Sequence, residues 1–157
     1  MSGELAIFNR QRAKSVNLRQ LRGLVTGLLT DLMPAKDYEL TIHIVGAVEM
    51  EEANRTYLGH SGSTDVITLD YCEPIWPLAG EILVCVDEAI IQAVRFRTSW
   101  QAELARYIVH GILHLKGYDD RRLAARQKMK RREDAVMRAW AREFDLSKLG
   151  SNPRVSR

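Results

Sequence analysis

The chain has little cysteine, little proline and no long apolar run. Its 157 residues include four prolines and two cysteines, Cys72 and Cys85. The cysteines lack the spacing of a metal-binding motif, so we expect reduced thiols that pack as small apolar residues rather than a disulfide. No stretch approaches the roughly 20 apolar residues of a membrane-spanning helix, and the apolar run near the start is too short for a secretory signal. We therefore expect a cytoplasmic protein that contacts no membrane.

The overall composition is that of a globular protein. Hydrophobic residues make up 46% of the chain and charged residues 27%, which excludes collagen-like, coiled-coil and wholly disordered proteins. A domain of about 150 residues buries enough surface to fold without a disulfide or a structural metal, so any metal is expected to serve chemistry. We expect one domain over residues 1–147 and a mobile tail with little to bury over residues 148–157.

Positive charge is concentrated near the C-terminus. Residues 1–120 hold 11 Lys and Arg against 16 Asp and Glu, whereas residues 121–157 hold 12 against 4. A basic segment of this kind can contact the phosphates of a nucleic acid, but a solvated helix face has the same composition. Both interpretations stay open on charge alone.

The hydrophobic pattern predicts an α+β fold in α/β/α layers, with a small mixed four-stranded sheet flanked by helices. Apolar residues alternate in some segments and recur at helical spacing in others. The expected strands cover residues 4–9, 38–45, 64–71 and 81–87, and the expected helices cover residues 17–33, 47–59, 87–99, 99–116 and 121–145. The last two strands are close in sequence, so we expect them to pair antiparallel.

The motif most informative about chemistry lies in the expected helix 99–116 and the turn after it. His110 and His114 are four residues apart, so their side chains project from one helix face. Gly117 can adopt a positive φ, end the helix and turn the chain back toward that face, which brings Asp120 near the histidines. Two imidazoles and one carboxylate leave the fourth position of a zinc ion open for water. The spacing favours a catalytic metal site over two histidines that share a surface by chance.

Gly111, beside the first histidine, strengthens this interpretation. A glycine costs a helix up to about 1 kcal/mol relative to alanine, so its presence in an otherwise apolar helix needs a reason. We interpret Gly111 as leaving room for substrate or water. Zincin peptidases carry a glutamate directly after the first histidine, where this chain has Gly111. A metallopeptidase is therefore the less favoured hydrolase.

The segment HGILHLKGYD, residues 110–119, resembles the signature of the YbeY family of zinc-dependent endoribonucleases, which mature ribosomal RNA in bacteria. The resemblance extends in matching order to NRTY at residues 54–57, STDVITLDY at residues 63–71 and GEILVCVDEA at residues 80–89. It implies a compact α/β fold, one zinc ion per chain held by the histidine motif, and cleavage of single-stranded ribosomal RNA. The implied partners are ribosomal RNA, the small ribosomal subunit and ribosome-assembly proteins.

Two positions near the implied site depart from the family pattern. The family's third ligand is a histidine, and Asp120 stands at that position. Asp119 is an alternative carboxylate, although its matched family position is not a ligand. The family arginine that follows the tyrosine of NRTY is replaced by Leu58. Arg55, one helical turn earlier, and His60, when protonated, are then the candidates for its phosphate contact.

The last expected helix also departs from the family, because it is basic here and often acidic in relatives. This change either alters only solubility or moves RNA phosphate contacts onto Arg121, Arg122, Lys128 and Arg131. In a third class of function, the metal site has decayed and the basic helix alone binds RNA during ribosome assembly.

The general base for RNA cleavage is not defined by the histidine motif. Glu81 and Asp65 are the acidic candidates, since a carboxylate can accept a proton from an attacking water or ribose hydroxyl. The alternative roles are structural: Glu81 as a surface residue at a strand end, and Asp65 as the cap of a turn.

Overall fold

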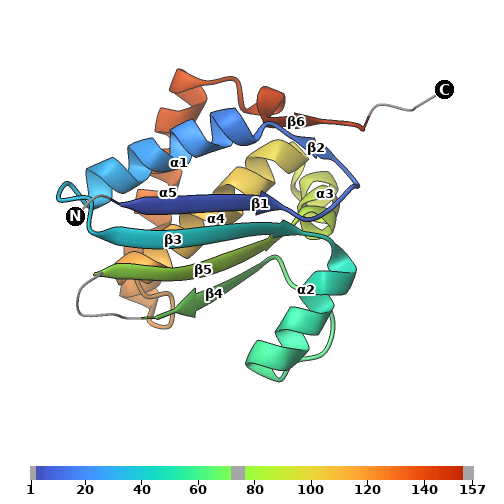
Figure 1. Ribbon diagram of the computed structural model, residues 1–157, viewed down its shortest axis with the longest axis horizontal. Coiled ribbons are helices and arrows are strands. Elements are labelled where there is room, and N and C mark those ends of the chain that lie inside the picture. Colours follow the sequence, from blue (N-terminus) through green and yellow to red (C-terminus); the bar gives the residue numbers. More distant parts are fainter. Residues whose placement is uncertain (1–2, 72–76, 154–157) are drawn as a thin grey trace.

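A four-stranded mixed sheet forms the centre of the molecule (Figure 1). The structure is a computed structural model that describes residues 3–71 and 77–153. In spatial order the strands are β1 (Glu4–Asn9), β3 (Tyr38–Val45), β5 (Leu78–Cys85) and β4 (Val66–Asp70). β1, β3 and β5 run parallel, and β4 pairs antiparallel with β5 at the edge. The predicted fold class and the antiparallel pair are confirmed, although β5 begins at Leu78 rather than at Glu81.

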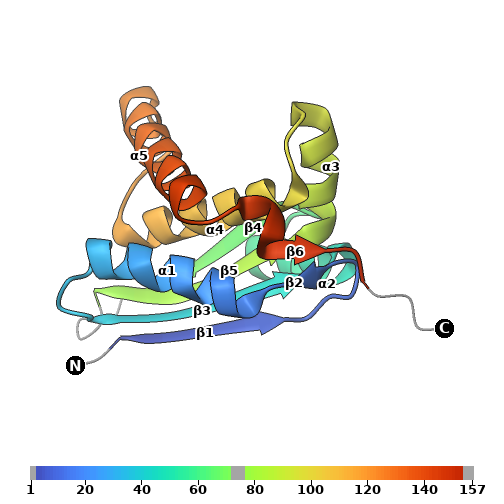
Figure 2. The ribbon, with the colours of Figure 1, turned by 90° about the horizontal axis from the view of Figure 1, so that it is seen from above.

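The helices are distributed unequally over the two faces of the sheet (Figure 2). α1 (Leu18–Leu32) and α4 (Trp100–Lys116) lie against one face, and α5 (Leu123–Glu143) packs on α4. α3 (Val86–Phe96) follows β5 directly and also packs on α4. α2 (Ala47–Ala53) and its π-helical continuation η1 (Asn54–Leu58) cover only one end of the other face. Much of that second face is therefore left without a helix.

Local sequence signals fix the ends of the two helices that pack on the sheet. The side chain of Asn17 accepts a hydrogen bond from the Gln20 amide at 3.2 Å, which caps α1. The Ser99 hydroxyl accepts from the Ala102 amide at 3.1 Å and caps α4 in the same way. At the other end of α4, Gly117 adopts φ 114°, a conformation that favours glycine. The helices predicted over residues 17–33 and 99–116 are thus confirmed.

Strand alternation sorts side chains to the two faces of the sheet. Leu40, Ile42 and Ile44 of β3 are buried in the main core beneath α1 and α4. His43, between them, faces the other side of the sheet. The same alternation on β5 turns Ile82 toward α4 and Glu81 away from it.

Gly111 allows α4 to approach the sheet closely. A Cβ atom at this position would stand 2.8 Å from Cγ2 of Ile82, closer than side chains pack. The interpretation that Gly111 leaves room for substrate or water is therefore wrong. The glycine faces β5, so what excludes a larger residue here is the packing of the helix on the sheet.

The chain beyond α5 is ordered further than predicted. After η2 (Leu146–Leu149), β6 (Gly150–Ser151) pairs antiparallel with β2 (Ser15–Val16). Leu149 is only 4% exposed, and the side chain of Gln101 donates a hydrogen bond to the Gly150 carbonyl at 3.0 Å. The first residues of the segment expected to be a mobile tail therefore pack against the domain.

The cysteines and the helix lengths bear on the expectations of reduced thiols and of no membrane-spanning helix. Cys85 is a buried free thiol, as expected, and burial raises its pKa. Cys72 lies outside the described residues. Within residues 3–71 and 77–153, every helix is too short or too polar to span a lipid bilayer.

Candidate metal centre

His110, His114 and Asp120 form one cluster of potential metal ligands. One ligand atom from each side chain lies within 4.8 Å of the other two. Oδ2 of Asp120 is 3.2 Å from Nε2 of His114 and 3.8 Å from Nε2 of His110. Ligand atoms placed about 2.0–2.2 Å from a tetrahedral ion stand roughly 3.3 Å apart, so these separations fit a shared ion. The three side chains could therefore hold a metal ion.

The turn after α4 brings Asp120 back over the histidines. The Gly117 amide donates to the His114 carbonyl and the Tyr118 amide to the Leu113 carbonyl, both at 3.0 Å. These bonds close the end of the helix with Gly117 in the left-handed region, as the sequence predicts. Asp120 then lies beside the last turn of α4 instead of continuing away from it.

Asp119, the alternative carboxylate, has a different partner. Its Oδ1 atom accepts hydrogen bonds from the backbone amide of Arg121 at 2.9 Å and from Nε of Arg121 at 3.1 Å. The bond from the Arg121 amide, together with the guanidinium, lowers the pKa of Asp119. Asp119 is not among the clustered ligands of the described residues, so the geometry favours Asp120.

Glu133 of α5 contacts the cluster through His110. Its Oε2 atom lies 3.1 Å from Nδ1 of His110, and its Oε1 atom accepts from Nη1 of Arg106 at 3.0 Å. Burial by itself would raise the pKa of Glu133, but the hydrogen bonds from His110 and Arg106 outweigh it and lower the pKa. The same bond to Glu133 raises the pKa of His110 against the opposing effect of burial. Glu133 is thus a buried carboxylate whose two oxygens are paired with an arginine and a histidine.

Glu133 is absent from the residues predicted for the site, although the sequence holds a signal for it. It lies on the buried stripe of α5, whose other members are apolar. These residues are Met129, Val136, Met137 and Trp140. A carboxylate is almost never buried without a partner, so its place on this stripe indicates a cation or histidine opposite.

The cluster lies in the wall of a pocket of about 490 Å³. The lining residues come from β4 and the segment before it, from α4 and from the turn after α4. They are Asp65, Val66, Thr68, Asp70, His110, His114, Leu115 and Asp120. Asp65 accepts hydrogen bonds through Oδ1 from the Val66 amide at 2.8 Å and the Thr64 hydroxyl at 3.3 Å. The structure therefore brings Asp65, one of the two candidate bases, to the candidate metal ligands.

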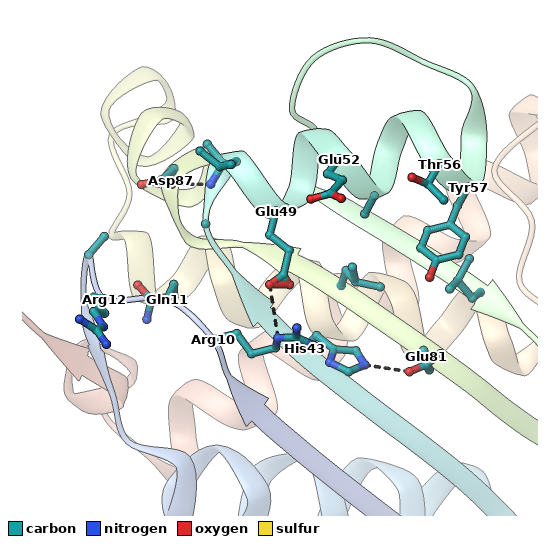
Figure 3. Close-up of a pocket in the computed structure, with 17 residues that line it drawn as sticks. Arg10, Gln11, Arg12, His43, Glu49, Glu52, Thr56, Tyr57, Glu81 and Asp87 are labelled. Carbon is teal, nitrogen blue, oxygen red and sulfur yellow. Dashed lines mark hydrogen bonds and ion pairs between the residues drawn. The ribbon is translucent and has the colours of Figure 1, made fainter.

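Glu81, the other candidate base, lies on the opposite face of the sheet. Its Oε1 atom accepts from Nε2 of His43 at 2.8 Å, and its Oε2 atom accepts from the Tyr71 hydroxyl. The Tyr71 bond, followed by that of His43, lowers the pKa of Glu81, and the same carboxylate raises the pKa of Tyr71 to about 12. His43 and Glu81 form the floor of a separate pocket of about 790 Å³ (Figure 3). The structure does not bring Glu81 to the histidine cluster.

The candidate RNA-binding residues fall into two groups. The first group follows Asp120 along the turn and α5 and is exposed to solvent. It consists of Arg121, Arg122, Lys128 and Arg131. The second group is Arg55 in η1 and His60 just after it, which are also exposed but do not line the pocket of the histidine cluster. Leu58, at the family's arginine position, is 46% exposed.

The amino-acid sequence is similar to several bacterial endoribonucleases. The relative named Endoribonuclease YbeY in Anaeromyxobacter sp. (strain Fw109-5) is 37% identical over 123 residues, covering 77% of this chain and 64% of the relative. That in Chlorobium phaeovibrioides is 40% identical over 93 residues, covering 59% and 62%. That in Alkaliphilus metalliredigens is 29% identical over 147 residues, covering 87% and 95%. The chain thus spans slightly less than two thirds of the first two relatives and nearly all of the third.

A solved structure and a family model agree with these relatives. The solution structure of TM1509 from Thermotoga maritima superposes with a TM-score of 0.62 at 24% identity, covering 88% of this chain and 93% of that one, which supports the fold. The family model described as Endoribonuclease YbeY matches residues 6–141, and this range includes every residue of the histidine cluster. The protein therefore belongs to the endoribonuclease YbeY family.

Proposed function

We propose that the protein is a zinc-dependent endoribonuclease that cleaves single-stranded ribosomal RNA during ribosome assembly in the cytoplasm. The observation that carries the proposal is the cluster of His110, His114 and Asp120 in the wall of an open pocket, in a chain of the YbeY family. Two imidazoles and one carboxylate are a ligand set typical of catalytic zinc, which keeps one position for water or substrate. One zinc ion per chain is therefore the proposed cofactor.

The proposed roles divide between ligands and base. Nε2 of His110, Nε2 of His114 and Oδ2 of Asp120 hold the ion. A zinc ion supplies a Lewis acid and an acidified water next to a phosphodiester. Asp65 lines the same pocket, and it accepts the proton of the attacking water or ribose 2′-hydroxyl. Glu81 has no part in this proposal, because it lies across the sheet from the cluster.

The proposed RNA path follows the basic turn and helix. Arg121 and Arg122 come directly after Asp120, and Lys128 and Arg131 continue the positive charge along α5. Phosphates of a strand bound in the pocket would meet these side chains first. Arg55 and His60 are proposed for phosphates farther along the strand. The small ribosomal subunit and assembly proteins are the proposed partners.

Cleavage of a fluorescently labelled single-stranded RNA by the zinc-loaded protein tests the proposal. We expect cleavage to be lost on chelation and in His114→Ala, because each removes the metal. His43→Gln is the control, since this histidine lies on the opposite face of the sheet and should leave cleavage intact. Cleavage that persists in His114→Ala would contradict the proposal. Chelator-sensitive digestion of casein would favour a peptidase instead, and salt-sensitive RNA binding without bound metal would favour a binding module.

A further inference from the structure

Glu133 is an unusual residue for the interior of this protein. Among the described residues, only Asn54 and Glu133 are polar or charged and buried, and Glu133 is 8% exposed. Burying a carboxylate is costly unless it is paired and hydrogen-bonded. Both of its oxygens are in fact used, one by Arg106 and one by His110. The position therefore serves a specific contact rather than general packing.

The contact with His110 defines which ring nitrogen carries the proton. Oε2 of Glu133 lies 3.1 Å from Nδ1 of His110, and its other oxygen is paired with the Arg106 guanidinium, so we assign the donor role in this bond to Nδ1. In the neutral ring this leaves Nε2 without a proton and free to bind a metal. Nε2 is also the atom that faces Asp120, at 3.8 Å from its Oδ2 atom. The ring is thus held in the tautomer and direction that a metal ligand needs.

Glu133 is itself held in place by an ion-pair network between α4 and α5. Arg106 lies one helical turn before His110 on α4, and its Nη1 atom donates to Oε1 of Glu133 at 3.0 Å. The same Nη1 atom donates to Oδ1 of Asp134 at 2.7 Å. The network runs from Asp134 through Arg106 to Glu133 and ends at His110. It fixes the carboxylate beside Nδ1 of His110, so the ring cannot rotate without breaking its hydrogen bond to Glu133.

We propose that Glu133 is a positioning residue that sets the tautomer and orientation of His110 for metal binding. The inference deepens the proposed function and rests on its metal site, but it concerns α5, which supplies no ligand. Outer carboxylates of this kind raise metal affinity by about 10- to 100-fold in known sites, because they orient the ligating histidine and increase its basicity. We expect Glu133 to act in the same range.

Zinc affinity of the folded protein, measured by competition with a colorimetric chelator and without RNA, tests the proposal. We expect Glu133→Leu to weaken zinc binding by about 10- to 100-fold. Glu133→Gln keeps an oxygen that accepts from Nδ1, so it should recover part of the loss. Glu143→Gln is the matched control: it removes an exposed carboxylate from the same helix, outside the network of Arg106, and its zinc affinity should stay close to that of the wild type.

The tautomer of His110 in the metal-free protein provides a second measurement that a purely structural role would not change. At a pH high enough for the ring to be neutral, nitrogen chemical shifts should show the proton on Nδ1 in the wild type and a mixture of tautomers in Glu133→Leu. A neutral wild-type ring with its proton on Nε2, or equal zinc affinities in Glu133→Leu and Glu143→Gln, would overturn the inference. If zinc affinity and tautomer respond as expected while RNA is not cleaved, only the proposed nuclease activity fails.

Discussion

Replacing Asp120 by alanine should weaken zinc binding because it removes one of three ligands. Structural zinc sites with four ligands have binding free energies of about 10–16 kcal/mol, or roughly 2.5–4 kcal/mol per ligand. A difference of about 1.4 kcal/mol changes an affinity tenfold, so the loss of one ligand corresponds to a loss of affinity of about 60- to 700-fold. The Asp120 side chain is 43% exposed, and water screens its charge. We therefore expect the lower part of that range, about 100-fold, for Asp120→Ala.

The matched control for this variant is Asp119→Ala. Asp119 has the same charge and is the neighbouring residue, but its oxygen is bound to Arg121 and not to the histidine cluster. An exposed ion pair of this kind contributes little, so the zinc affinity of Asp119→Ala should stay close to that of the wild type. Both affinities can be measured by titration against the same chelator at neutral pH.

Asp120→His provides the third comparison, since it installs the histidine of the family pattern. A longer imidazole donor at this position should retain zinc binding if the turn places the residue as described. The reasoning would be refuted if Asp119→Ala lost zinc while Asp120→Ala kept it. It would also be refuted if neither substitution altered the affinity, because the turn would then contribute no ligand.

Three further predictions concern packing, catalysis and pH. Gly111→Ala should lower the free energy of unfolding by about 1–2 kcal/mol, because overpacking against Ile82 exceeds the gain in helix propensity. Urea unfolding measures this, and an unchanged unfolding midpoint would contradict the prediction. Asp65→Asn should lower kcat for RNA cleavage by about 100-fold or more while zinc affinity stays constant; a loss of zinc instead would assign Asp65 to the ligands. Glu81→Gln should lower the free energy of unfolding near neutral pH. The folded-state pKa of Glu81 lies below its ordinary value of 4.5, so the wild-type advantage should be present above that value and disappear as pH falls through the folded-state pKa. A constant difference across that range would exclude the Tyr71 and His43 bonds as its source.

The sequence alone determined the part of the site that depends on local geometry. His110 and His114 share a helix face because four residues make about one turn, and this holds wherever the helix packs. Gly117 ends the helix because glycine readily adopts a positive φ, and the short turn after it carries Asp120 back to the same face. These features require only neighbouring residues, so pattern and turn chemistry were enough to predict them.

Only the tertiary structure decided which distant residues meet this cluster. Glu133 is 23 positions from His110, and their contact depends on how α5 packs on α4. Asp65 and Glu81 are equally plausible acids in the sequence, but the pairing of β4 with β5 and the packing of α4 place one beside the cluster and the other across the sheet. The side chains of a strand alternate between the two faces of the sheet. The packing of α4, which carries the histidines, determines which of these faces adjoins the candidate metal site.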